Sequence, residues 1–111
     1  MNYKVKILET AKKDIKKLYK KYKNIKNDMI GLIELLENNP KKGIHLGKNF
    51  YKIRIKNSDN LKGKSGGYRI IYYLIDENDE VWILKVYSKS DIDNIPNEYI
   101  FSLLTKSTMK N

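Results

Sequence analysis

The chain has 111 residues, of which 23 are Lys or Arg and 13 are Asp or Glu, giving a formal net charge of +10. This length favours a single domain over residues 1–111, and a hydrophobic fraction of 41% excludes wholesale disorder. There is no cysteine and His45 is the only histidine, which excludes disulfides and zinc sites built on thiolates or histidines. We expect no metal and no cofactor.

The sequence also carries no membrane signal. No apolar run reaches the roughly 18 residues that a membrane span needs, and lysines interrupt the N-terminus where a signal peptide would be apolar. We therefore expect a cytoplasmic protein without a membrane partner.

The positive charge is concentrated in the middle of the chain. Residues 41–75 hold nine basic side chains and one acidic side chain, a net charge of +8, whereas residues 1–40 carry +5 and residues 76–111 carry −3. Such self-repulsion disfavours the folded state unless a negative partner offsets it. The middle third therefore predicts a surface for an anion, although scattered lysines can also serve only to keep a surface solvated.

The first third of the chain predicts one strand and two helices. In residues 2–8, apolar side chains alternate with lysines, the period of a half-buried strand. Thr10 is the expected N-cap of a helix whose apolar residues recur at helical spacing up to Ile25. A second helix is expected at about residues 27–38, ending before Pro40, and the short turn between the two helices predicts a helical hairpin.

The middle of the chain changes to strand patterns. A glycine-containing connection is expected at residues 41–49. The next stretch, FYKIRIK, alternates apolar and basic side chains, which places Lys52, Arg54 and Lys56 on one face of a strand. A loop rich in Gly, Ser, Asn and Asp follows at residues 57–67.

The last third predicts a hairpin and a closing helix. Residues 68–75 form a continuous β-rich run, typical of a strand covered on both faces. Residues 81–87 are its antiparallel partner across a polar turn, and a short helix is expected at residues 96–105 with Pro96 in its first position. The order of elements predicts an α+β fold: an N-terminal strand, a helical hairpin, an antiparallel strand meander and a short C-terminal helix.

The hairpin is expected to gather basic and aromatic side chains on one face. A register that pairs Ile75 with Val81 places Arg69 opposite Tyr87. The residues expected on this face are Arg69, Tyr73, Lys85, Tyr87 and Lys89. Guanidinium and ammonium groups bind phosphates, and tyrosine rings can stack on unpaired bases for about 1–3 kcal/mol each, so this face suits RNA; the alternative is that the tyrosines only pack.

Familiar catalytic motifs are missing. A single histidine in a connection cannot support a Ser-His-Asp triad. The GKSGG stretch precedes a strand, so no helix N-terminus is available to bind phosphate as in a P-loop.

Four stretches, taken in order, resemble the RelE/ParE toxin superfamily and in particular its HigB/RelE branch: LGKNFYKIRIK, KGKSGGYRIIYYLI, VWILKVYSKSD and NIPNEYI. The resemblance covers nearly the whole chain. It implies a toxin of a bacterial type II toxin-antitoxin system, an endoribonuclease that cuts mRNA in the ribosomal A site. Its partners would be the mRNA, the ribosome and a cognate antitoxin that neutralises it.

The resemblance also implies site residues. Arg69 matches the arginine of the family's G-Y-R stretch, and Lys89 matches the basic residue after the last strand. Basic residues on the preceding strand and loop match more loosely, at Lys52, Arg54, Lys62 and Lys64. The chain departs from the family near its end, where efficient RNA-cutting members often carry Tyr or His, because Ile95 stands six residues after Lys89.

The implied chemistry needs no metal. RNA supplies its own nucleophile, the 2′-OH, so the protein has to align it, neutralise developing charge and help the 5′-oxygen leave. We expect Arg69 to stabilise the transition state, Lys89 to neutralise charge or donate a proton, and Lys64 or Lys52 to position the phosphate, one of them acting as base if cationic neighbours lower its pKa. The expected RNA-binding residues are Lys52, Arg54, Lys56, Lys62 and Tyr87.

Two other functions remain open at this stage. A ParE-like protein of the same fold would arrest DNA gyrase by binding it. A basic RNA- or ribosome-binding module would bind RNA in a salt-dependent manner without cutting it. Fold analogy alone does not choose among the three.

Overall fold

A computed structural model describes residues 2–60, 66–89 and 95–108 of the chain. No helix within these ranges is long and apolar enough to cross a membrane. The elements are β1 (Lys4–Ile7), α1 (Glu9–Tyr19), α2 (Ile25–Asn38), β2 (Ile44–Gly47), β3 (Phe50–Ile55), β4 (Tyr68–Ile75), β5 (Glu80–Ser88) and α3 (Asn97–Thr108).

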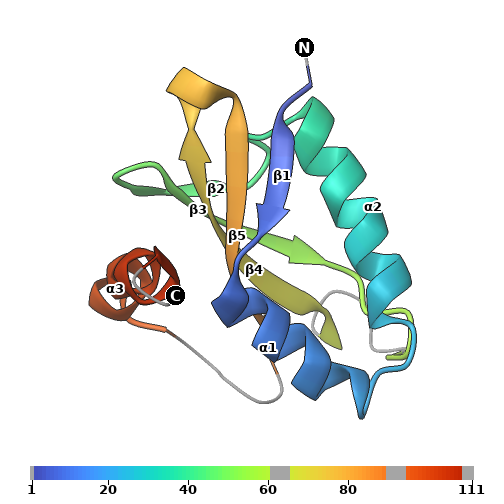
Figure 1. Ribbon diagram of the computed structural model, residues 1–111. Coiled ribbons are helices and arrows are strands. Elements are labelled where there is room, and N and C mark those ends of the chain that lie inside the picture. Colours follow the sequence, from blue (N-terminus) through green and yellow to red (C-terminus); the bar gives the residue numbers. More distant parts are fainter. Residues whose placement is uncertain (1, 61–65, 90–94, 109–111) are drawn as a thin grey trace.

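The strands form one twisted sheet in the order β1-β5-β4-β3-β2. Strands β2 to β5 are an antiparallel meander, and β1 pairs in parallel with the first half of β5 (Figure 1). The predicted α+β fold is therefore confirmed, with the N-terminal strand added to the meander at the β5 edge.

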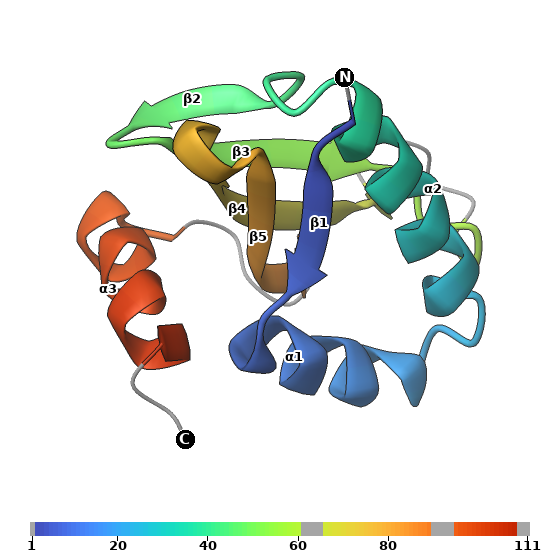
Figure 2. The ribbon, with the colours of Figure 1, turned by 45° about the horizontal axis from the view of Figure 1, so that its top comes forward.

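The sheet carries a core on each face. Figures 1 and 2 show α2 running beside β1 over one face, α1 crossing the end of the sheet, and α3 on the other side. Strand β4 contributes to both cores, because Ile70 belongs to the core on the α1/α2 side while the adjacent Ile71 belongs to the core that includes Leu103 of α3. Both isoleucines are fully buried, as expected for a strand covered on both faces.

The structure contains a strand that the sequence pattern did not predict. Strand β2 lies within the stretch expected to be an irregular connection, and it pairs antiparallel with β3. It is only four residues long, and Ile44 and His45 are both exposed, so no buried alternation marks it. The turn that follows has positive φ at Gly47, Lys48 and Asn49, which bends the chain sharply back into β3.

The expected N-cap of the first helix is wrong. Helix α1 begins at Glu9 with Leu8 in the N-cap position, and Thr10 lies inside the first turn. The Thr10 hydroxyl donates a hydrogen bond of 2.5 Å to the backbone carbonyl of Leu84 in β5. Docking against the sheet edge therefore determines where this helix starts, rather than the local capping preference.

The hairpin register is right at one end and shifted by one residue at the other. Arg69 lies opposite Tyr87, as predicted. A β-bulge midway along the hairpin changes the register, so Ile75 pairs with Glu80 instead of Val81. The error does not reach the end of the hairpin that carries the basic side chains.

Candidate functional site

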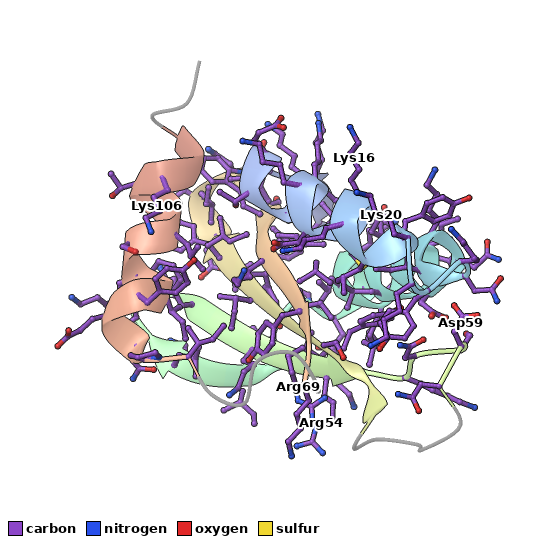
Figure 3. All side chains as sticks on the ribbon, turned by 90° about the horizontal axis from the view of Figure 1, so that it is seen from below. Lys16, Lys20, Arg54, Asp59, Arg69 and Lys106 are labelled. Carbon is purple, nitrogen blue, oxygen red and sulfur yellow. The ribbon has the colours of Figure 1, made fainter. Side chains whose placement is uncertain are left out.

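Three side chains form a row across the sheet face opposite α2. Arg69 in β4 is flanked directly by Arg54 of β3 and by Tyr87 of β5. Directly opposed residues of antiparallel strands have Cβ atoms about 4.5–5.5 Å apart. Figure 3 shows the two arginines together, on the side of the molecule away from α1. Strand pairing therefore brings the predicted catalytic arginine together with two predicted RNA-binding residues.

Arg69 is a buried cation without a counter-charge. Arg69 is only 7% exposed, and its Nη1 atom is buried without a hydrogen-bond partner among the described residues. Neither Arg69 nor Arg54 forms an ion pair within the parts of the chain that the structure describes. Removing a charge from water is costly unless it is paired. Binding of an anion next to Arg69 would therefore offset the cost of burying its guanidinium.

The pKa of Arg69 is lowered by its burial and by the neighbouring positive charge. Burial lowers the pKa of this guanidinium, the neighbouring Arg54 lowers it further, and Tyr87 acts in the opposite direction. An arginine nevertheless stays protonated at neutral pH. The row therefore presents a permanent positive charge that is poorly hydrated and close to a second one.

Tyr87 forms the β5 side of the row. It is 5% exposed, and burial raises its pKa while the adjacent Arg69 guanidinium acts to lower it. The net pKa lies above the ordinary value near 10, so the phenol keeps its proton at neutral pH. The ring of Tyr87 belongs to the core on the α3 side, so this residue can donate a hydrogen bond from its hydroxyl but cannot serve as a base there.

A basic cleft lies beside this row, at the outer edge of β3. It has a volume of about 260 Å³ and is lined by Lys42, Lys52 and Arg54 together with apolar residues around Ile44. Sequence reasoning identified the two β3 residues but missed Lys42. Pairing of β2 with β3 brings it there, and no sequence pattern marks β2.

The remaining predicted residues are not assembled in this row. Lys56 is exposed just beyond the end of β3, and Lys89 is exposed in the turn after β5. Lys62 and Lys64 lie outside the described residues. Among the residues that are described, no three His, Asp or Glu side chains are grouped as a metal site requires.

Lys85 lies opposite Ile71, as predicted, but its side chain is paired with an acidic residue of α1. Its ammonium lies 3.5 Å from the carboxylate of Asp14 in α1, and the same carboxylate accepts a hydrogen bond of 3.0 Å from the Val86 backbone N–H. The acidic partner on a distant helix thus draws this lysine to the β5 edge, which simple strand alternation could not reveal.

The sequence model of the family described as "ParE toxin of type II toxin-antitoxin system, parDE" matches residues 5–93. A mutant of the Escherichia coli toxin RelE in the free state matches with a TM-score of 0.64 and 22% identity, covering 97% of this chain and 99% of that one. RelBE2 of Mycobacterium tuberculosis, a toxin-antitoxin complex, matches with a TM-score of 0.54 and 23% identity over 79% and 99% of the two chains. The intact E. coli RelBE complex matches with a TM-score of 0.51 and 28% identity over 76% and 93%.

The fold is thus that of toxins solved with and without their antitoxins. The chain belongs to the RelE/ParE superfamily of type II toxin-antitoxin toxins.

Proposed function

We propose that this toxin is a metal-independent endoribonuclease that cuts mRNA in the ribosomal A site and so inhibits translation. One observation carries the proposal: the Arg69 guanidinium is buried, lacks a counter-charge among the described residues, and lies between Arg54 and Tyr87. A phosphodiester would supply the missing anion, and the adjacent phenol could donate a hydrogen bond to it.

The reaction can proceed with the groups of the RNA itself. The 2′-oxygen attacks the neighbouring phosphorus, the bond from phosphorus to the 5′-oxygen breaks, the 2′-OH loses its proton and the 5′-oxygen gains one. The products are a 2′,3′-cyclic phosphate and a 5′-OH. Arg69 would bind the non-bridging oxygens, whose negative charge grows in the transition state.

The other basic residues would hold the strand and complete the chemistry. Lys52 and Arg54 would bind flanking phosphates from β3, together with Lys56 and, from the loop, Lys62. Lys89 would neutralise charge or donate the proton to the leaving oxygen. Lys64 would position the scissile phosphate.

We further propose a cognate antitoxin as the partner that neutralises this toxin in the cytoplasm. RelE homologues are solved in complex with their antitoxins. An antitoxin rich in Asp and Glu would complement the basic face described here, in which Arg54 and Arg69 have no acidic partner among the described residues.

Arg69→Ala tests the proposed activity. We expect mRNA cleavage after induction, mapped by primer extension, to fall by about 100- to 1000-fold, as for loss of an oxyanion-binding donor. Arg69→Lys should recover only part of it, because lysine keeps the charge but not the bidentate geometry. Lys20→Ala on the outer side of α1 is the matched control and should cut like the parent. A folded Arg69→Ala protein that still cuts mRNA at the parental rate would refute the proposal.

Gyrase inhibition is the second candidate, because the matching family model is that of ParE toxins. A supercoiling assay with purified gyrase discriminates the two. Inhibition of supercoiling without mRNA cleavage would replace the first proposal. Salt-dependent RNA binding without cleavage would instead identify a non-catalytic RNA-binding module.

A further inference from the structure

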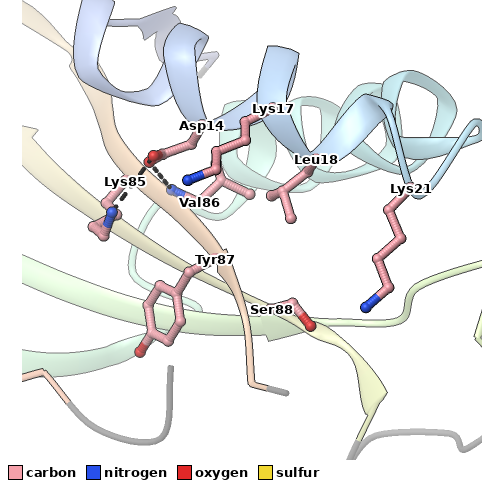
Figure 4. A pocket seen from close by; sticks show the side chains of 8 residues that line it. All are labelled: Asp14, Lys17, Leu18, Lys21, Lys85, Val86, Tyr87 and Ser88. Carbon is pink, nitrogen blue, oxygen red and sulfur yellow. Dashed lines mark hydrogen bonds and ion pairs between the residues drawn. The ribbon is translucent and has the colours of Figure 1, made fainter. Parts of the chain in front are cut away.

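A second basic cleft lies between α1 and the edge of β5. Strand β1 pairs only with Glu80–Ile83, so the rest of β5 would be an open sheet edge. The first turns of α1 cover the part of this edge that follows Ile83, and there the Asp14 carboxylate accepts a hydrogen bond from the Val86 N–H. Beyond this contact a cleft of about 490 Å³ remains (Figure 4). Its lining residues are Asp14, Lys17, Leu18, Lys21, Lys85, Val86, Tyr87 and Ser88.

The cleft has an excess of positive charge. Three lysines face one carboxylate, and Asp14 is already engaged by Lys85 at 3.5 Å. Lys17 and Lys21 form no ion pair within the described parts of the chain. The Lys21 ammonium lies 5.3 Å from the centroid of the Tyr22 ring, and Lys17 is attracted by Asp14. Neither ammonium is neutralised by an ion pair, so both can bind an anion from outside the protein.

The cleft and the Arg69 site share one residue, Tyr87. This tyrosine lines the cleft, and it is also the direct cross-strand neighbour of Arg69. Figure 4 shows its ring extending from β5 below the Lys17 and Lys85 side chains. A chain with regularly spaced negative charges can occupy both places at once, which an isolated anion cannot.

We propose that this cleft binds a further phosphodiester of the same RNA strand whose scissile phosphate lies at Arg69, with Lys17 and Lys21 as the phosphate ligands. The proposal rests on the proposed ribonuclease function and extends it to the path of the substrate. A volume of about 490 Å³ is within the range of about 300–1,000 Å³ found for ligand sites. Ammonium groups bind phosphate without demanding a base sequence, so this subsite would add affinity rather than codon preference.

The decisive variants are two charge-reversed pairs on the same helix region. Lys17→Glu/Lys21→Glu alters the cleft, and Lys16→Glu/Lys20→Glu is the matched control with the same change in net charge. Lys16 and Lys20 do not line the cleft. In Figure 3 they extend from α1 on the side opposite Arg54 and Arg69. Lys16 and Lys17 both lie in the last turn of α1, so helix effects are matched.

The measurement is single-turnover cleavage of synthetic mRNAs on purified ribosomes. We expect the cleft pair to raise the half-saturating concentration by about 10- to 100-fold, since a hydrogen bond to a charged group is worth about a factor of ten. The maximal rate should stay within about twofold, because these lysines do not touch the reacting atoms. The control pair should match the parent protein.

Stepwise truncation of the mRNA on either side of the cut identifies what the cleft holds. The effect of the cleft pair should disappear once the nucleotide that occupies the cleft is removed. An effect independent of mRNA length would assign the lysines to ribosomal RNA and overturn the proposal. Equal behaviour of the two pairs would overturn it as well, whereas absence of any cleavage by the parent protein would instead refute the ribonuclease function.

Asp14→Asn should strengthen mRNA binding, whereas the lysine substitutions should weaken it. The amide oxygen can still accept the Val86 N–H, while the one carboxylate among the described residues that line the cleft is lost. We expect tighter mRNA binding, with a severalfold lower half-saturating concentration. If the glutamate pair fails to fold, as judged by circular dichroism, Lys17→Gln/Lys21→Gln replaces it and should weaken binding by about tenfold. Unchanged binding in these neutral variants would contradict the proposal.

Discussion

At the scale of single residues, Arg69 shows a conflict between stability and function. It is a buried cation with a lowered pKa, and its neighbours supply one more positive charge and no negative charge among the described residues. A protein selected only for stability would place an apolar side chain at this position of β4. The strand is otherwise occupied by isoleucine, leucine and tyrosine, so the arginine is the exception that needs a ligand.

Arg69→Met should therefore stabilise the protein while abolishing cleavage. Methionine fills a similar volume without a charge, and we expect the free energy of unfolding to rise by about 1–2 kcal/mol. Urea denaturation at neutral pH measures it, with Lys20→Met at the C-cap of α1 as the exposed control. A loss of stability in Arg69→Met would show that the guanidinium supports the fold.

At the scale of elements, Asp14 joins α1 to the open edge of β5. Its carboxylate accepts the Val86 N–H and pairs with Lys85. Burial raises the pKa of Asp14, and the contacts with Val86, Lys85 and Lys17 oppose this only in part. The hydrogen bond rather than the negative charge is therefore what the fold needs from this residue.

Two substitutions of Asp14 separate these contributions. Asp14→Ala leaves the Val86 N–H without a partner and should cost about 1–3 kcal/mol, whereas Asp14→Asn should cost much less at neutral pH. Because the folded pKa is raised above the unfolded value, the proton stabilises the folded state, and this contribution is present at low pH and lost as the pH rises through the folded pKa. Urea titrations from neutral to acidic pH should show the parent gaining stability relative to Asp14→Asn. Equal losses in the Ala and Asn variants would contradict the assignment.

The elements also show what sequence patterns can and cannot predict. Strands β3 and β4 were predictable because long runs of alternating or continuous apolar residues leave few other folds. Their pairing, together with the register at Arg69 and Tyr87, was enough to place the arginine row. Strand β2 was not predicted because a short exposed edge strand has no alternation of buried and exposed residues that a sequence pattern could reveal.

The side-chain contacts that the sequence did not reveal join elements far apart in the chain. Thr10 and Lys85 both turn toward partners across the α1–β5 junction, more than 70 residues away in the chain. Lys42 reaches the basic cleft only because β2 joins the sheet. Local propensity carries no information about such partners, so tertiary structure overrides it.

At the scale of the whole molecule, the two cores are unequal. Among the described residues, sixteen buried side chains pack on the α1/α2 side of the sheet and seven on the α3 side. The larger core includes most of the sheet and both N-terminal helices. Helix α3 should therefore open more easily than the rest of the fold.

Leu36→Ala and Leu103→Ala compare the two cores, since both leucines are almost fully buried. Leu36→Ala in α2 should lower the global free energy of unfolding by about 2–5 kcal/mol. Leu103→Ala should mainly accelerate hydrogen exchange of the α3 amides while the amides of β4 stay protected. Equal loss of protection in β4 for both variants would show that the two cores unfold together.

The net charge of +10 acts on RNA mostly through the few cations that touch phosphates, because the Debye length is about 8 Å at physiological ionic strength. Each phosphate neutralised on a single strand contributes about −0.7 to the slope of log affinity against log salt.

We therefore expect Arg54→Gln, which removes one exposed guanidinium of the row, to reduce the magnitude of this slope by about 0.7. Lys20→Gln removes the same charge on the opposite side of the molecule and should leave the slope unchanged (Figure 3). The affinity of an oligonucleotide with a 2′-deoxy group at the cleavage position, titrated at several salt concentrations, measures this directly. Equal slopes for the two variants would mean that the protein binds RNA through its overall charge and not through the arginine row.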